Sequence, residues 1–143
     1  MKNLNDYEFY KDDWCTIYCG DNREIAPMIK PQSIDLIVTD PPYPKEFLPC
    51  FSYLSSFGKH ALKIGNHLLC YSGQSYLTEV MNRLNENLIY RWTISLLHIR
   101  NTMLWSGRVI NRWKPIIVMQ NGKEDGKKIK MFQDVVRSSG RDK

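Results

Sequence analysis

The 143-residue sequence lacks an apolar stretch long enough to cross a membrane, and it lacks a Cys-x-x-Cys pair. Its first six residues are too polar for a signal peptide, so we expect a protein of the reducing cytoplasm. In that compartment the four cysteines, three of which lie in apolar runs, would be buried free thiols rather than disulfides or zinc ligands. The three histidines have no metal-ligand spacing either, and we assign no metal site.

Positive charge is in modest excess. Twenty Lys and Arg against fifteen Asp and Glu give a net charge of +5. Such an excess is compatible with a nucleic-acid partner, although it does not require one. The length fits one domain, 1–143, in which 1–13 would be a polar lead-in and 121–143 an exposed, Gly- and Lys-rich connection.

The most informative stretch is an apolar run at 34–38 that ends in Asp40, Pro41, Pro42 and Tyr43. Its mostly β-branched residues predict a short strand buried on both faces. Each proline lacks a backbone donor and fixes φ, so the strand must stop at Asp40. A carboxylate, two carbonyls and a phenol ring would then lie on a stiff corner at the carboxyl end of a strand, where open α/β sheets bind ligands.

This corner has the chemistry to hold an amine on a flat ring. The Asp40 carboxylate and the Pro41 carbonyl accept hydrogen bonds without donating any, and an NH2 group offers two donors. The Tyr43 ring could stack on a heterocycle that carries the amine, a contact worth about 1–3 kcal/mol per base.

Asp-Pro-Pro-Tyr resembles the catalytic motif of the DNA amino-methyltransferases. The resemblance implies a flipped base in double-stranded DNA, methylated at adenine N6 or cytosine N4 with S-adenosylmethionine as donor. It implies catalytic roles for Asp40, Pro41, Pro42 and Tyr43, with Asp40 also near the cofactor. Because the family's adenine enzymes mostly begin the motif with Asp, Asp40 favours adenine. Such enzymes often serve restriction-modification, but the sequence identifies neither a recognition site nor a nuclease partner.

Gly20 and Asp21 end an earlier predicted strand, 14–19, and precede a short helix at 23–29. Asp21 could simply cap that helix. The same dipeptide is similar to the family's acidic strand end, which implies that Asp21 faces the adenosine part of the cofactor. The two roles can coexist.

The rhythm of strand and helix predicts a Rossmann-like α/β fold with a doubly wound, mostly parallel sheet. Helices are expected near 47–63 and 74–86, with a strand at 67–72 between them. Leu77, Val80, Met81 and Leu84 share one face of the second helix. Right-handed crossovers would place the strand ends at Gly20, Tyr43 and Gly73 along one edge.

Two later strands, 90–99 and 112–120, are expected as an antiparallel pair at the sheet edge, and one more strand could begin at Asp134. Trp92 and Trp113 are expected in the core. The loop 100–108 between the strands is basic and aromatic, which suits a DNA face. The segment 111–118 is similar to the family's late strand, which ends near the base pocket. The residues predicted to bind DNA are Arg100, Trp105, Arg108, Arg112 and Lys114.

The sequence contains no Gly-x-Gly. The resemblance implies a Gly-rich turn that holds the cofactor, and only the order with the catalytic corner first fits this chain. We therefore expect an incomplete, amino-terminal part of the fold that binds S-adenosylmethionine weakly or not at all. It would associate with itself through an open sheet edge. Two alternatives stay open: a methyltransferase for cytosine N4 or another amine, and a non-catalytic, decayed DNA-binding remnant.

Overall fold

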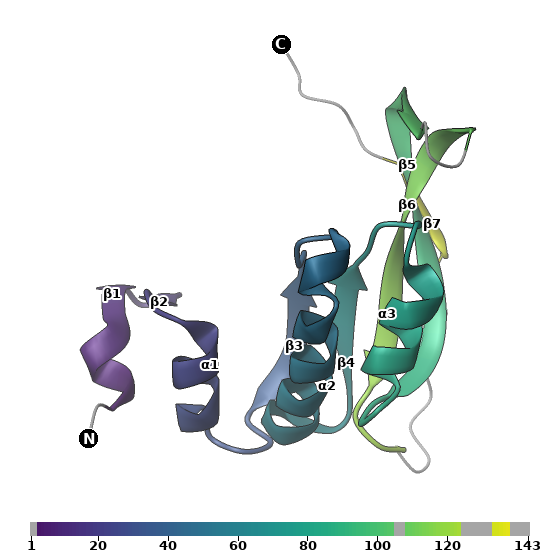
Figure 1. The fold of residues 1–143 in the computed structure, drawn as a ribbon. Helices are drawn as coiled ribbons and strands as arrows, with labels where there is room; N and C mark the ends of the chain where they lie inside the picture. Colours follow the sequence, from purple (N-terminus) through teal and green to yellow (C-terminus); the bar gives the residue numbers. More distant parts are fainter. Residues whose placement is uncertain (1–2, 105–107, 124–132, 138–143) are drawn as a thin grey trace.

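The computed structural model describes residues 3–104, 108–123 and 133–137, without the side chains of 99–104. Its main body is a five-stranded sheet in the order β3-β4-β6-β5-β7 (Figure 1). The bounds are β3 Ile34–Thr39, β4 Leu62–Tyr71, β5 Ile89–Leu104, β6 Val109–Gln120 and β7 Val135–Arg137. β3 pairs with β4 and β5 with β7 in parallel, whereas β6 runs antiparallel to both β4 and β5.

The sheet is therefore mixed, and the expected antiparallel pair does not lie at the edge. β5 and β6 form a hairpin, and β6 then returns to the centre of the sheet beside β4. Residues 116–120 of β6 are buried, as a central strand with neighbours on both sides requires. The strand expected from Asp134 is present as β7, at the outer edge.

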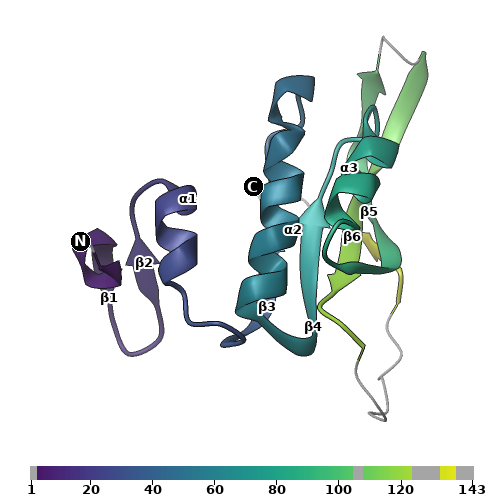
Figure 2. The same cartoon turned by 60° about the horizontal axis from the view of Figure 1, so that its bottom comes forward.

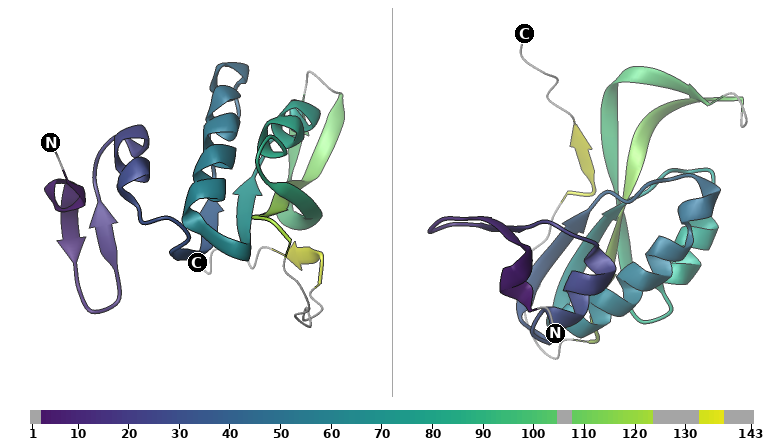
Figure 3. Two further views of the ribbon diagram at one scale, coloured as in Figure 1. Left: turned by 90° about the horizontal axis from the view of Figure 1, so that it is seen from below. Right: turned by 60° about the vertical axis from the view of Figure 1, so that its left-hand side comes forward.

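Two helices, α2 (Pro49–Ala61) and α3 (Leu77–Leu84), cover the same face of this sheet (Figures 1 and 3). Between them and the sheet lies the core, which includes Phe51, Leu68, Leu84, Ile117 and Met119. The predicted face of α3 is confirmed, since Val80 and Leu84 are buried and its other two members pack against the core. The doubly wound prediction is wrong for the described residues, whose helices leave the other face of the sheet uncovered by helix.

The sequence predicts a lead-in at 1–13, a strand of the main sheet at 14–19 and a short helix at 23–29. The structure instead has a separate unit on the β3 side of the sheet (Figure 2). Strand β1 (Glu8–Lys11) pairs antiparallel with β2 (Thr16–Tyr18), so Gly20 follows a strand outside the main sheet. The unit also contains the 3-10 helices η1 (Leu4–Tyr7) and η2 (Ala26–Met28) and the short helix α1 (Asn22–Ile25). A third 3-10 helix, η3 (Lys45–Phe47), precedes α2.

Strand β3 lies where predicted but is not buried on both faces. It is the edge strand, and Leu36 and Val38 are 51% and 62% exposed. A register irregularity between Ile34 and Leu36 lets Ile34 pack with Ile37 against the core, while the two exposed residues face away. The predicted burial of this strand therefore holds only in part. Ile34 and Ile37 pack against the core, whereas Leu36 and Val38 are open to solvent.

Two further expectations of burial change. Cys15, Cys19 and Cys50 are exposed free thiols, and only Cys70 is buried. Asn121, placed in the exposed connection by its sequence, is fully buried. No helix in the described ranges is long and apolar enough to cross a membrane.

Candidate active site

The Asp40 corner lies at the carboxyl end of β3, next to the end of its parallel neighbour β4 (Figure 1). Thr39, the last residue of β3, pairs with Cys70, so Asp40 comes directly beside the end of β4. Burial, and then the negative charge of Asp40, raise the pKa of Cys70 to about 12. The Cys70 thiol therefore keeps its proton.

Tyr43 packs into the same edge and donates a hydrogen bond from its hydroxyl to Oδ1 of Asp40. Burial, and then this bond, raise the pKa of Tyr43 above its ordinary value, so the phenol keeps its proton. Gly73, which follows β4, leaves room for the ring: a Cβ added there would lie 3.3 Å from both Cβ and Cγ of Tyr43. The expected meeting of the Tyr43 and Gly73 strand ends is confirmed, and Gly20 is not part of it.

A pocket of about 250 Å³ opens beside Tyr43 and Pro44, between α2, the loop that joins β4 to α3, and α3 itself. Its walls are mostly apolar, with two phenol rings and two serines among them. The lining residues are Tyr43, Pro44, Phe51, Ser72, Gly73, Ser75, Tyr76 and Val80. Such a pocket suits a flat aromatic ring that carries a few polar groups.

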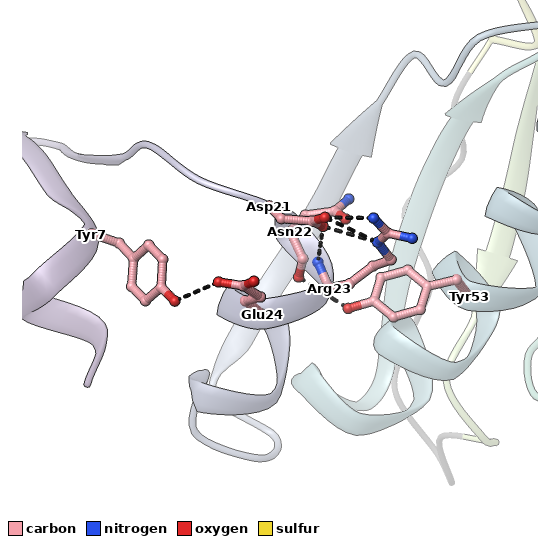
Figure 4. A network of polar contacts seen from close by, with 6 residues as sticks. All are labelled: Tyr7, Asp21, Asn22, Arg23, Glu24 and Tyr53. Atoms are coloured by element: carbon pink, nitrogen blue, oxygen red, sulfur yellow. Dashed lines mark hydrogen bonds and ion pairs between the residues drawn. The ribbon is translucent and has the colours of Figure 1, made fainter. Parts of the chain in front are cut away.

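Asp21 lies apart from this edge, at the start of α1 in the N-terminal unit. It caps the helix by accepting from the Arg23 backbone N–H at 2.8 Å. Both of its oxygens also pair with the Arg23 guanidinium, whose Nη2 lies 2.6 Å from Oδ2 (Figure 4). These bonds lower the pKa of Asp21 to about 2. Capping is therefore present, and any cofactor would compete with Arg23 for the carboxylate.

The N-terminal unit is tied to the main body by a few polar contacts. Tyr53 of α2 donates to the Asn22 carbonyl at 3.0 Å (Figure 4). Within the unit itself, the Tyr7 hydroxyl donates to Glu24 at 2.7 Å. His60, to which the sequence assigned no role, contacts the Ile29 carbonyl through Nε2 at 2.9 Å.

The basic segment between the late strands is mostly strand, not loop. Residues 102–104 of β5 pair with 109–111 of β6, and this hairpin extends beyond the carboxyl ends of β3 and β4 (Figure 1). Arg108 and Arg112 are exposed on it, whereas Lys114 is half-buried and reaches Tyr43. The backbone of Arg100 belongs to β5, but its side chain and all of Trp105 lie outside the described residues.

The two tryptophans assigned to the core behave differently. Trp92 is 51% exposed and donates to Asp134 Oδ2 at 3.2 Å, so that prediction is wrong. Trp113 is partly buried. Trp92 pairs with Val118, whereas the strand neighbours Ile117 and Met119 belong to the core, so alternation along the strands turns Trp92 away from that core. The sequence of β5 alone could not reveal this.

Several residues of this edge were missed by sequence reasoning. Gln74 donates through Nε2 to the Trp113 carbonyl at 3.0 Å and to Asn111 Oδ1 at 3.2 Å. The Ser72 N–H donates to the Pro115 carbonyl at 3.1 Å. These bonds join the loop after β4 to β6. Their partners lie more than 35 residues apart in sequence, and no local pattern indicates them.

The architecture is similar to that of TTHA0409 from Thermus thermophilus, a candidate DNA modification methylase. The TM-score is 0.65 at 17% identity, over 82% of this chain and 64% of that one. A second structure, M1.HpyAVI bound to SAM, has a TM-score of 0.54 at 11% identity, over 77% of this chain and 60% of that one. The chain shares the fold of DNA modification methylases.

Structures of both of these proteins contain bound S-adenosyl-L-methionine. TTHA0409 in complex with S-adenosyl-L-methionine matches with a TM-score of 0.62 and 18% identity, over 77% of this chain and 54% of that one. The chain thus spans about two thirds of the TTHA0409 structure or less. No family model matches the sequence, and no curated protein matches it. Among the residues that the structure describes, no cluster of His, Cys, Asp and Glu could hold a metal ion.

Proposed function

We propose that this chain carries the base-binding half of a DNA methyltransferase that modifies an exocyclic amine, most specifically adenine N6. The observation that carries the proposal is the Asp40 to Tyr43 corner, at the carboxyl end of β3 in a methylase fold. Asp40 leads us to prefer adenine over cytosine, because the motif it begins resembles that of the adenine enzymes.

The corner can hold a target amine in a reactive orientation. Asp40 and the Pro41 carbonyl would accept the two N–H bonds of the amine, and Tyr43 would stack on the base. The lone pair of the nitrogen would then point away from both acceptors, toward an approaching methyl group. S-adenosylmethionine, when bound, supplies that methyl group on a positively charged sulfur.

The pocket beside Tyr43 offers the space for the flipped base. Tyr43 and Tyr76 line it with aromatic surface, and Ser72 and Ser75 add polar groups. Tyr43 connects this pocket to the acidic corner, because it lines the pocket and its hydroxyl donates to Asp40. DNA phosphates would meet the hairpin, where Arg108 and Arg112 are exposed; we propose the same contact for Arg100 and a base-side contact for Trp105.

The residues fit the cofactor less well than the base. The sequence has no Gly-x-Gly turn, and both oxygens of Asp21 are held by Arg23. To bind the adenosine end of S-adenosylmethionine, Asp21 would have to give up its bonds to the Arg23 guanidinium. This favours a second candidate function, a non-catalytic chain that keeps the base and DNA contacts.

The test measures whether Asp40 recognises the 6-amine of adenine by a hydrogen bond. Single-stranded oligonucleotides with one adenine are compared with matched ones carrying purine, which lacks the 6-amine, for binding to the full chain. We expect about tenfold tighter binding to adenine, because a hydrogen bond to a charged acceptor contributes about 1.5–3 kcal/mol. Asp40→Ala should abolish this preference and leave the circular dichroism spectrum and the unfolding midpoint unchanged.

If Asp40→Ala preferred adenine over purine as strongly as the wild type does, the proposed role of Asp40 would be contradicted. Calorimetry with S-adenosylmethionine, followed by mass spectrometry of the DNA, separates the two candidate functions. N6-methyladenine formed by the wild type and lost in Asp40→Ala supports catalysis by this chain. N4-methylcytosine would transfer the activity to the other base, and absence of cofactor binding supports the non-catalytic candidate.

A further inference from the structure

Lys114 belongs to β6, far from Asp40 in sequence, yet its ammonium contacts Tyr43 in two ways. Nζ donates a hydrogen bond of 3.1 Å to the Tyr43 hydroxyl. The same atom lies 4.8 Å from the centroid of the Tyr43 ring. The first contact is charge-assisted, and the second is within cation–π range. The side chain that makes both contacts is half-buried.

Tyr43 connects Lys114 to Asp40. Its hydroxyl accepts from Lys114 and donates to Oδ1 of Asp40, so the three side chains form one chain of hydrogen bonds. A hydroxyl that accepts from a charged donor becomes a stronger donor itself, since successive hydrogen bonds polarise one another. Because the Tyr43 oxygen accepts from Lys114, its own O–H is left to donate to Asp40.

The backbone on either side of Lys114 is held firmly. The Trp113 carbonyl accepts from Gln74, and the Pro115 carbonyl accepts from the Ser72 N–H. Pro115 itself is fully buried. Lys114 thus projects from a supported stretch of a central strand, which is the arrangement expected of a residue that orients another side chain.

We propose that Lys114 is a positioning residue, which sets the Tyr43 ring and the Asp40 carboxylate for the incoming base and does not contact a DNA phosphate. The proposal rests on the proposed function and changes the role that the sequence predicted for Lys114. Arg112 is a matched control, because it is a cation two residues away on the same strand whose side chain is exposed.

The first experiment needs no ligand. The full chain is labelled with 3-fluorotyrosine, and the Tyr43 fluorine signal is assigned through Tyr43→Phe. We expect Lys114→Met to move this signal well outside its linewidth, Lys114→Arg to return it toward the wild-type position, and Arg112→Met to leave it in place. A Tyr43 signal unchanged in Lys114→Met would overturn the proposal.

The second experiment compares the adenine and purine oligonucleotides over a range of salt concentrations. We expect the preference for adenine to fall from about tenfold to below about threefold in Lys114→Met, with recovery in Lys114→Arg. The dependence of log affinity on log salt should keep its wild-type slope. A slope reduced by about one unit with the preference intact would identify a phosphate contact and overturn the proposal.

The two experiments separate the two proposals. Should the wild type show no preference for adenine, the base-binding function fails, and the fluorine spectrum still decides whether Lys114 positions Tyr43.

Discussion

Three residues contact the Tyr43 side chain in the candidate site. Asp40 accepts from its hydroxyl, Lys114 donates to the same oxygen, and Gly73 packs closely against Cβ and Cγ. Its ring is therefore oriented before any base arrives. A ring held in place loses little conformational entropy on stacking, which favours binding.

Asp21 is held by two groups of Arg23, the guanidinium and the backbone N–H. The Arg23 guanidinium, and then the Arg23 backbone N–H, lower the pKa of Asp21 from 3.8 to about 2. We expect Arg23→Met to raise this pKa part of the way back, since the backbone hydrogen bond remains. Titration of the Asp21 carboxyl carbon by NMR measures it, with Lys30→Met, the loss of another exposed cation, as control.

The sign of the linked stability effect follows from the lowered pKa. Ionised Asp21 favours the folded state above the unfolded value near 3.8, and this contribution disappears as the pH falls through about 2. The contribution is small because the pair is exposed to solvent. An Asp21 pKa that stays near 2 in Arg23→Met would show that capping alone lowers it.

At the scale of elements, one buried side chain joins the end of α2 to the end of β6. Asn121 Nδ2 donates to the Leu62 carbonyl at 2.7 Å and to the Lys59 carbonyl at 3.3 Å. Its backbone exchanges bonds with the bulged start of β4, at Gly65 and Asn66. The last carbonyls of a helix need such donors when water is excluded.

Replacement of Asn121 by Leu should destabilise the fold. It removes the side-chain N–H bonds to the Leu62 and Lys59 carbonyls at a buried position, and such a loss costs about 1–3 kcal/mol of unfolding free energy. Urea denaturation measures the change, and Lys123→Ala, an exposed neighbour, should stay within about 0.5 kcal/mol of the wild type. Equal midpoints for the two variants would contradict the capping role.

At the scale of the whole molecule, the sheet has an open side. β3 is an edge strand, and its outer backbone groups have no strand partner in the described ranges. Leu36 and Val38 expose apolar surface on the same strand. An unprotected edge of this kind favours pairing with another chain.

We expect the chain to self-associate through β3. Leu36→Thr with Val38→Thr keeps β-branched or strand-compatible side chains and should reduce association, at a cost below about 1 kcal/mol of stability. Sedimentation velocity over a concentration series measures the association. Ile37→Thr, which faces the core, is the control that should lower stability without this benefit. Association unchanged in the double variant would place the contact elsewhere.

By itself the sequence determined the position of β3, its stop at Asp40 and the buried face of α3. These depend on local causes: the missing donor and fixed φ of Pro41 and Pro42, and helical spacing. It also indicated that Tyr43 and Gly73 would share an edge, because parallel strands bring their carboxyl ends together.

Only the tertiary structure decided the rest of the site. Whether Lys114 meets Tyr43 or solvent depends on β6 lying at the centre of the sheet and on the register that pairs Tyr71 with Ile116. A shift of one residue would turn Lys114 to the opposite face, because side chains alternate along a strand. That register is set by packing between residues some 45 positions apart in sequence, which no local pattern contains.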